Sequence, residues 1–154
     1  MIQFYLAKKD DDYTEARILF KEYAAAININ LDFQHFGEEL EGLKKMYASP
    51  DGGIILAKEA SEIIACVAIR KISESVGELK RMYTKPGHQN KGIGKVLLEN
   101  ALQLAKDCNY AVVKLDTLNY MLPAIHLYQQ AGFNKIAAYY YNPIPTAVYF
   151  EKVL

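Results

Sequence analysis

Apolar positions in the N-terminal third of the chain recur first as a short run and then at helical spacing. Residues 2–7 form an apolar run that predicts a strand. The acidic cluster at 10–12 follows, and acidic residues favour a helix N-terminus through capping and the helix dipole. Apolar residues then recur at helical spacing over 16–27 and, in a second segment, over 36–47. We therefore expect one strand followed by two helices.

The middle of the chain is predicted to contain three strands and the strongest helix. Residues 54–58 and 63–72 are joined by a short polar link, a pattern that predicts an antiparallel hairpin. A third strand is expected over 78–84, where Lys-Pro-Gly follows and ends it. Residues 92–106 carry an apolar stripe at helical spacing, which predicts a long amphipathic helix.

The last third alternates between strand and helix patterns. A continuous apolar strand is expected over 111–115, and a short helix over 123–130, where proline suits the first turn and Gly132 the end. Aromatic, β-prone segments at 136–141 and 147–153 predict two final strands. Without repeat or linker, residues 1–154 are expected to form one mixed α/β (α+β) domain around a single sheet.

Composition narrows the class of protein and of partner. The chain has 154 residues, 51% of them hydrophobic, and a formal net charge of zero. We therefore expect a globular protein that binds neither nucleic acid nor an anionic membrane through bulk charge. Cys66 and Cys108 sit in apolar runs, which favours buried thiols in a reducing compartment. With no signal-peptide pattern at the N-terminus, the cytoplasm is the expected location.

A glycine-bearing loop, Gln89 to Gly94, opens the long predicted helix. Unpaired N–H groups at a helix start bind anions, and glycines let a phosphate approach the backbone. A Walker loop needs Lys-Ser/Thr after its second glycine, but Ile93-Gly94 stands there. A dinucleotide fingerprint needs a glycine or alanine where Leu97 stands. The remaining interpretation is a loop that binds the pyrophosphate of coenzyme A. The alternative is that the loop is only the start of a helix that happens to carry two glycines.

Three motifs in family order resemble the GNAT superfamily of N-acetyltransferases over nearly the whole chain. They are a fourth-strand motif at 79–86, the pyrophosphate loop at 89–94, and a helix motif, PAIHLYQQAGF, at 123–133. The resemblance implies a single domain whose mixed sheet splays between strands four and five, flanked by about four helices.

The resemblance also implies acetyl-CoA as cofactor. The pyrophosphate would lie on Gln89, Asn90, Lys91, Gly92, Ile93 and Gly94, with Lys95 adding charge. The pantetheine arm would bond to the backbone of strand four near Met82 and Thr84. Many relatives carry an asparagine where Met121 stands here, and Asn119, two residues earlier, is the candidate to replace it.

Acetyl transfer to an amine needs a base for the amine and an acid for the departing thiolate. Glu78, at the start of strand four, matches a carboxylate that many family members use as base, directly or through water; a solvated strand-end carboxylate is the alternative. Tyr128 matches the family's tyrosine acid, beside the alternative of a core tyrosine. The three histidines show no metal-ligand spacing, and no metal site is expected. No activated Ser or Cys nucleophile is recognisable, so direct transfer in a ternary complex is predicted.

The resemblance implies that the acceptor enters from the side made by the first two helices and the last hairpin. The candidate residues are Phe33, Phe36, Tyr140 and Tyr141, and a regular strand would turn Tyr140 away from its two neighbours. A small amine or amino acid is the predicted acceptor, and the chain is expected to be a monomer or homodimer. Rival hypotheses are a non-catalytic acyl-CoA sensor, a protein-acetylating enzyme and an interaction subunit that dimerises through its aromatic tail.

Overall fold

The computed structural model describes residues 1–154, which form one seven-stranded sheet with helices on both faces. The N-terminal part contains β1 (Ile2–Leu6), α1 (Asp10–Ile27), the 3-10 turn η1 (Asp32–Gln34), α2 (Phe36–Glu41) and α3 (Leu43–Met46). The middle contains β2 (Gly53–Glu59), β3 (Glu62–Ser73), β4 (Val76–Thr84) and α4 (Ile93–Asp107). The C-terminal part contains β5 (Val112–Leu118), α5 (Leu122–Gln130), β6 (Asn134–Ile136) and β7 (Ala147–Val153).

The strands are ordered β1-β2-β3-β4-β5-β7-β6, and only β4 and β5 run parallel. All other neighbouring pairs are antiparallel, including the predicted hairpin of β2 and β3. The predicted mixed sheet around a single domain is therefore confirmed.

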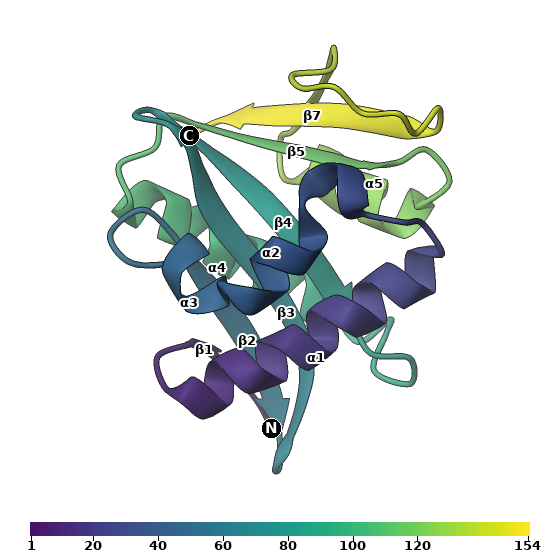
Figure 1. Cartoon of the computed structure of the whole chain (residues 1–154). Coiled ribbons are helices and arrows are strands. Elements are labelled where there is room, and N and C mark those ends of the chain that lie inside the picture. The colour runs from purple at the N-terminus through teal and green to yellow at the C-terminus, as the bar shows by residue number, and fades with distance from the viewer.

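Two apolar layers cover the two faces of the sheet. Figure 1 shows α1, α2 and α3 in front of the strands and α4 behind them. The front layer packs Leu19 and Phe20 of α1 against sheet residues such as Leu56. The rear layer packs Leu97 and Ala101 of α4 against the opposite face of the sheet. Each strand contributes side chains to both layers, because successive side chains along a strand point to opposite faces of the sheet.

The segment predicted as one helix over 36–47 is two short helices. The chain breaks at Gly42 (φ −117°, ψ 32°), whose flexibility suits a change of direction. Helical spacing of apolar residues survives across the break, since Leu43 and Tyr47 are both buried. The structure therefore has five α-helices where about four were expected.

The strand predicted over 136–141 is wrong. β6 ends at Ile136, and residues 137–146 form an irregular loop before β7. Aromatic β-propensity is overridden here, because Tyr139 and Tyr140 turn inward to bond acidic side chains of β4 and β5.

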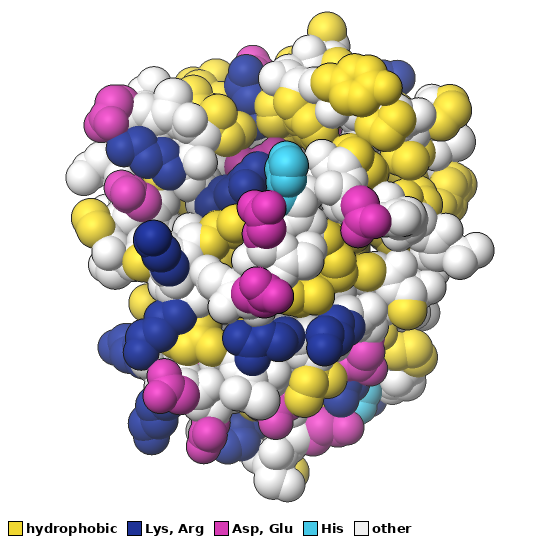
Figure 2. Space-filling view, in the orientation of Figure 1, with side chains coloured by type: hydrophobic (Ala, Val, Ile, Leu, Met, Phe, Trp, Pro, Cys, Tyr) yellow, Lys and Arg dark blue, Asp and Glu magenta, His cyan; other side chains and the backbone are white.

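None of the helices combines the length and the apolar character that a membrane span requires. On the face drawn in Figure 2, basic and acidic side chains are interspersed, and hydrophobic side chains gather towards the upper right, at the end where β7 and its preceding loop lie.

Candidate functional site

The two parallel strands β4 and β5 pair over three residues and then separate. The register joins Val76 to Val112 and Glu78 to Lys114, and no pairing follows. β5 instead continues beside β7 to Leu118. The expected splay between strands four and five is confirmed. Residues of β4 beyond Glu78 therefore have no strand partner on that side, and their backbone polar groups need other partners.

A bulge bends β4 within this opening. Cys66 of β3 pairs with Tyr83, but Ala68 pairs with Lys80, so β4 has one extra residue there. Arg81 takes the left-handed conformation (φ 59°), which is rare for a residue with a side chain. Such bulges re-aim side chains next to functional sites.

Buried charges hold the bulge in place. The Arg81 guanidinium donates to both Glu39 oxygens, at 2.7 Å and 3.1 Å, and the Tyr47 hydroxyl donates to Glu39 at 2.7 Å. Burial alone would raise the pKa of Glu39, but the hydrogen bonds and charge of Arg81 hold it below its usual value. The helical segment 36–47 is thereby tied to β4, with the ring of Phe36 5.1 Å from the Arg81 guanidinium carbon.

The predicted pyrophosphate loop lines a cavity of about 540 Å³, the loop-side cavity. Of the predicted cofactor residues, it brings together Met82, Thr84, Gln89, Asn90, Gly92, Ile93, Gly94 and Lys95. Lys91 and Asn119 do not line it. Asn119 is exposed, whereas Met121 lines the wall, so the expected replacement by Asn119 is not supported by this geometry.

Two glycines shape the helix start at this cavity. Gly92 caps α4 with φ 79°, a conformation that a side chain disfavours. A Cβ at Gly94 would lie 3.0 Å from Leu127 Cδ1, so this glycine also lets α4 and α5 approach. The first N–H groups of α4, which follow Gly92, have no acceptor in a preceding helical turn. They can therefore donate hydrogen bonds to an anion.

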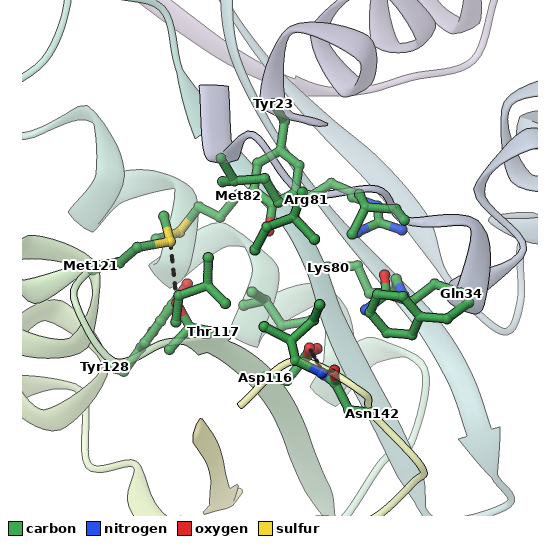
Figure 3. A pocket seen from close by; sticks show the side chains of 18 residues that line it. Tyr23, Gln34, Lys80, Arg81, Met82, Asp116, Thr117, Met121, Tyr128 and Asn142 are labelled. Carbon is green, nitrogen blue, oxygen red and sulfur yellow. Dashed lines mark hydrogen bonds between the residues drawn. The ribbon is translucent and has the colours of Figure 1, made fainter. Parts of the chain in front are cut away.

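A second cavity, the inner cavity, lies in the opening of the sheet. Its volume is about 50 Å³, enough for a few atoms. Figure 3 shows its wall, with Met121 and Tyr128 on one side, Gln34 on the other and Asp116 between them. Met82, Met121 and Ala124 line both the inner and the loop-side cavity, so the two adjoin.

Tyr128 lies where α5 reaches the inner cavity. Its side chain is 5% exposed and packs against the rings of Phe133 and Phe150. Burial raises the pKa of Tyr128, so the phenol stays protonated at neutral pH. Tyr128 is therefore a core tyrosine that also lines the inner cavity, and the role of acid assigned to it stays a prediction.

Glu78 is not a solvated strand-end carboxylate. Its side chain is buried, and Arg70 Nε donates to Oε1 at 2.7 Å. The Tyr139 hydroxyl donates to Oε2 at 2.6 Å. Both oxygens therefore have a close partner, and the role of base assigned to Glu78 stays a prediction.

Asp116 was missed in the sequence, because the strand around it was predicted to end at residue 115. It lines the inner cavity, and the Tyr140 hydroxyl donates to Oδ2 at 2.7 Å. Burial raises the pKa of Asp116 above its ordinary value. An acidic residue between apolar residues, Leu115 and Leu118 flanking Asp116-Thr117, was the available signal.

A third, more open cavity, the outer cavity, lies on the helical side and has a volume of about 350 Å³. Phe33, Gln34 and Lys80 line both it and the inner cavity. Of the predicted acceptor residues, Phe33 and Tyr140 line the outer cavity, whereas Phe36 lies behind it on Arg81. Tyr141 is 83% exposed and lines none of the three cavities. The predicted alternation is wrong, since Tyr139 and Tyr140 both point inward, with ring centroids 5.3 Å apart.

Lys80 stands between the inner and outer cavities. Burial, followed by the charge of Arg81, lowers the pKa of Lys80 to about 8. Its Nζ lies 3.9 Å from Glu78 Oε1, a distance too long for a strong hydrogen bond.

Comparisons with known proteins agree with this geometry. Residues 20–133 match the model of the acetyltransferase (GNAT) family. An uncharacterized N-acetyltransferase of Schizosaccharomyces pombe is 31% identical over 97% of this chain and 93% of its own length. A GNAT-family acetyltransferase of Staphylococcus aureus has the same fold, with a TM-score of 0.82 over 99% of each chain at 20% identity. The PaiA N-acetyltransferase of Thermoplasma acidophilum, solved in complex with coenzyme A, has a TM-score of 0.75 over 100% of this chain and 99% of its own, at 19% identity. The chain belongs to the acetyltransferase (GNAT) family.

Proposed function

We propose that this protein transfers the acetyl group of acetyl-CoA to the primary amine of a small molecule or amino acid, directly and in a ternary complex. The observation that carries the proposal is the set of three adjoining cavities across the sheet opening. The loop-side cavity has the donors for a diphosphate, and the outer cavity adjoins the inner cavity through a different set of residues, Phe33, Gln34 and Lys80. The inner cavity, between them, has Tyr128 in its wall.

The residues of the loop-side cavity fit coenzyme A. The N-terminus of α4, with Gly92 and Gly94, offers backbone N–H groups to the diphosphate, and Lys95 adds positive charge. Met82 and Thr84 lie along the free edge of β4, where backbone groups can bond an amide-bearing arm. Bound acetyl-CoA supplies the thioester whose acetyl group is transferred.

Tyr128 is proposed to donate a proton to the departing thiolate. Because burial raises its pKa, a lasting phenolate is costly in this site. The phenol therefore acts best when it gives its proton to sulfur and regains one from the newly acylated nitrogen in the same event. A relay of this kind avoids stored negative charge in the inner cavity.

Direct transfer is supported by the placement of the two cysteines. Neither Cys66 nor Cys108 lines any of the three cavities. Cys66 is buried, Cys108 is half-buried, and burial raises the pKa of both thiols, which disfavours the nucleophilic thiolate. The cytoplasmic location and the monomeric or homodimeric state expected from the sequence stay predictions.

The proposal is tested by measuring free thiol released from acetyl-CoA in the presence of a panel of alkylamines, arylalkylamines and amino acids. Amine-dependent thiol release, with the acetylated amine identified by mass spectrometry, is expected. Binding of acetyl-CoA with no release for any amine would favour the non-catalytic sensor instead. Acetylation of added proteins but of no small amine would favour a protein-acetylating enzyme.

A further inference from the structure

Asp116 has one carboxylate oxygen that no protein group occupies. Tyr140 Oη and Asn142 Nδ2 both approach Oδ2, at 2.7 Å and 3.5 Å. No hydrogen bond from the protein reaches Oδ1, and no lysine or arginine forms an ion pair with Asp116, since Arg81 pairs with Glu39 and Lys80 approaches Glu78. Oδ1 of this half-buried carboxylate is therefore free to accept a hydrogen bond from a ligand.

Gln34, which lines the same cavity, has a second unpaired acceptor. Its Nε2 donates to Tyr140 Oη at 2.9 Å, and Tyr140 in turn donates to Asp116. This chain of bonds fixes which end of the amide carries the oxygen. Gln34 Oε1 is buried and has no hydrogen-bond partner. Two acceptors at one small cavity match a group with several N–H donors, and an ammonium has three.

Glu78, in contrast to Asp116, has no carboxylate oxygen without a hydrogen-bond donor. Each of its oxygens has a partner within 2.7 Å, one from Arg70 and one from Tyr139. It lines the outer cavity but not the inner cavity that contains Tyr128. An amine bound at Glu78 would first have to displace an arginine or a tyrosine.

The order of the cavity walls gives the direction of approach. Gln34 lies on the boundary with the outer cavity, and Tyr128 and Met121 lie on the side of the loop-side cavity. Asp116 stands between these two sides (Figure 3). The inner cavity, at about 50 Å³, holds an amino group and little more, so the remainder of the acceptor must lie in the outer cavity.

We propose that Asp116 and Gln34 bind the ammonium group of the acceptor, that Asp116 takes a proton from it, and that the acceptor is a small primary amine entering from the outer cavity. This inference rests on the proposed function and deepens it. Burial strengthens Asp116 as a base, because the desolvated carboxylate has a raised pKa.

In the proposed transfer the acceptor nitrogen loses two protons, and a C–N bond replaces the C–S bond. The ammonium gives one proton to Asp116 and becomes a neutral amine. Its nitrogen forms the C–N bond to the acetyl carbon as the C–S bond breaks. The thiolate takes the proton of Tyr128, which regains one from the nitrogen of the new amide. Asp116 then releases its proton to solvent, and the sum is amide, thiol and one proton.

The test is steady-state kinetics of Asp116→Asn with acetyl-CoA and three acceptors: butylamine, tyramine and tyrosine. Loss of a general base should lower kcat/KM for the amine by about 10²-fold or more. The thermal shift produced by acetyl-CoA should stay as in the wild type, because Asp116 does not line the loop-side cavity. The control is Asp107→Asn, at the exposed end of α4, where Asp107 accepts only from Gln103.

A second variant, Gln34→Leu, tests amine binding separately. Loss of the unpaired acceptor should raise KM for the amine about tenfold while kcat changes little. An unchanged kcat/KM in Asp116→Asn overturns the inference and leaves the proposed function standing. If Asp116→Asn does not fold, an unchanged KM in Gln34→Leu overturns the inference instead. Wild-type protein that binds acetyl-CoA but acetylates none of the three amines contradicts the proposed function and this inference together.

Discussion

At the scale of single residues, the proposed mechanism gives opposite tasks to a buried tyrosine and a half-buried carboxylate at the inner cavity. Tyr128 must give up a proton and Asp116 must accept one, and burial raises the pKa of each. The same desolvation keeps the phenol protonated and makes the carboxylate more basic. The two roles are separable by substitution.

Tyr128→Phe should lower kcat about 10²-fold, because it removes the acid and leaves the ring packed on Phe133. Binding of acetyl-CoA and the unfolding midpoint should change little. The measurement is thiol release alongside thermal unfolding, with Tyr120→Phe, at an exposed position, as matched control. Full activity in Tyr128→Phe would remove this tyrosine from the mechanism.

Asp116→Asn should stabilise the fold at neutral pH, even as it lowers activity. The folded-state pKa of Asp116 is raised above the ordinary value of 3.8, so its ionisation costs stability. The stability that wild type gains from the protonated carboxyl group is fully present below pH 3.8 and is lost as pH rises through the folded-state pKa. Asparagine keeps an acceptor for Tyr140 and does not ionise.

The gain in Tm of Asp116→Asn over wild type should therefore grow from pH 4 to pH 7. Thermal unfolding across this range measures it, with Asp107→Asn expected to show no such trend. A variant that is less stable than wild type at pH 7 but not at pH 4 would mean that the carboxylate is stabilised in the fold, contrary to this account.

At the scale of elements, the sequence predicted the regular segments well and the irregular ones poorly. The periodicity of α4 and the hairpin of β2 and β3 matched the structure, because their apolar patterns agree with their packing. The tyrosines after Ile136 were expected in a strand, but hydrogen bonds to Glu78 and Asp116 fix them in a loop. The bulge at Arg81 was not predicted either, since the residue that imposes it, Glu39, lies 42 positions away.

Gly92→Ala should weaken acetyl-CoA binding, and Gly87→Ala should not. Both glycines have positive φ, 79° and 90°, and neither would place a Cβ against another atom. Each substitution should therefore cost about 1 kcal/mol of unfolding free energy through backbone strain alone. Only Gly92 lines the loop-side cavity, so titration calorimetry with acetyl-CoA distinguishes the two. Equal affinities of the two variants for acetyl-CoA would mean that the helix start at Gly92 takes no part in binding it.

Glu39→Leu should destabilise the protein by about 3–5 kcal/mol, because it leaves the buried Arg81 without its partner. The double variant Glu39→Leu/Arg81→Met should recover much of this loss, since no charge is then left unpaired. Urea denaturation of the two variants and wild type measures both effects. If the double variant is no more stable than the single one, the loss in Glu39→Leu does not come from the unpaired charge of Arg81.

At the scale of the whole molecule, the inner cavity in the sheet opening adjoins both the loop-side and the outer cavity. The sequence located the loop-side cavity, because motifs with fixed spacing carry it. At the inner cavity it located Phe33, Met82 and Tyr128 but not Asp116, whose link to Gln34 through Tyr140 joins separate segments of the chain. Contacts between distant segments depend on the register of the sheet and leave no local pattern. The residues of the acceptor side are therefore identified mainly from the structure.

The oligomeric state also belongs to this scale, and light scattering measures it. A monomer that retains amine-dependent activity would exclude the interaction subunit that is stable only as a dimer. A dimer that dissociates when the exposed Tyr141 is replaced by serine would support it.

The most direct test of the central claim is thermal unfolding with and without acetyl-CoA, with adenosine alone as control. Ligand at a hundred times its Kd stabilises a protein by about 2.7 kcal/mol. For a domain of this size that predicts a rise in Tm of roughly 5–11 °C. A rise with acetyl-CoA but not with adenosine is the predicted result. An unmoved midpoint at saturating acetyl-CoA would mean that the loop at 89–94 is only a helix start, and would contradict the proposed function.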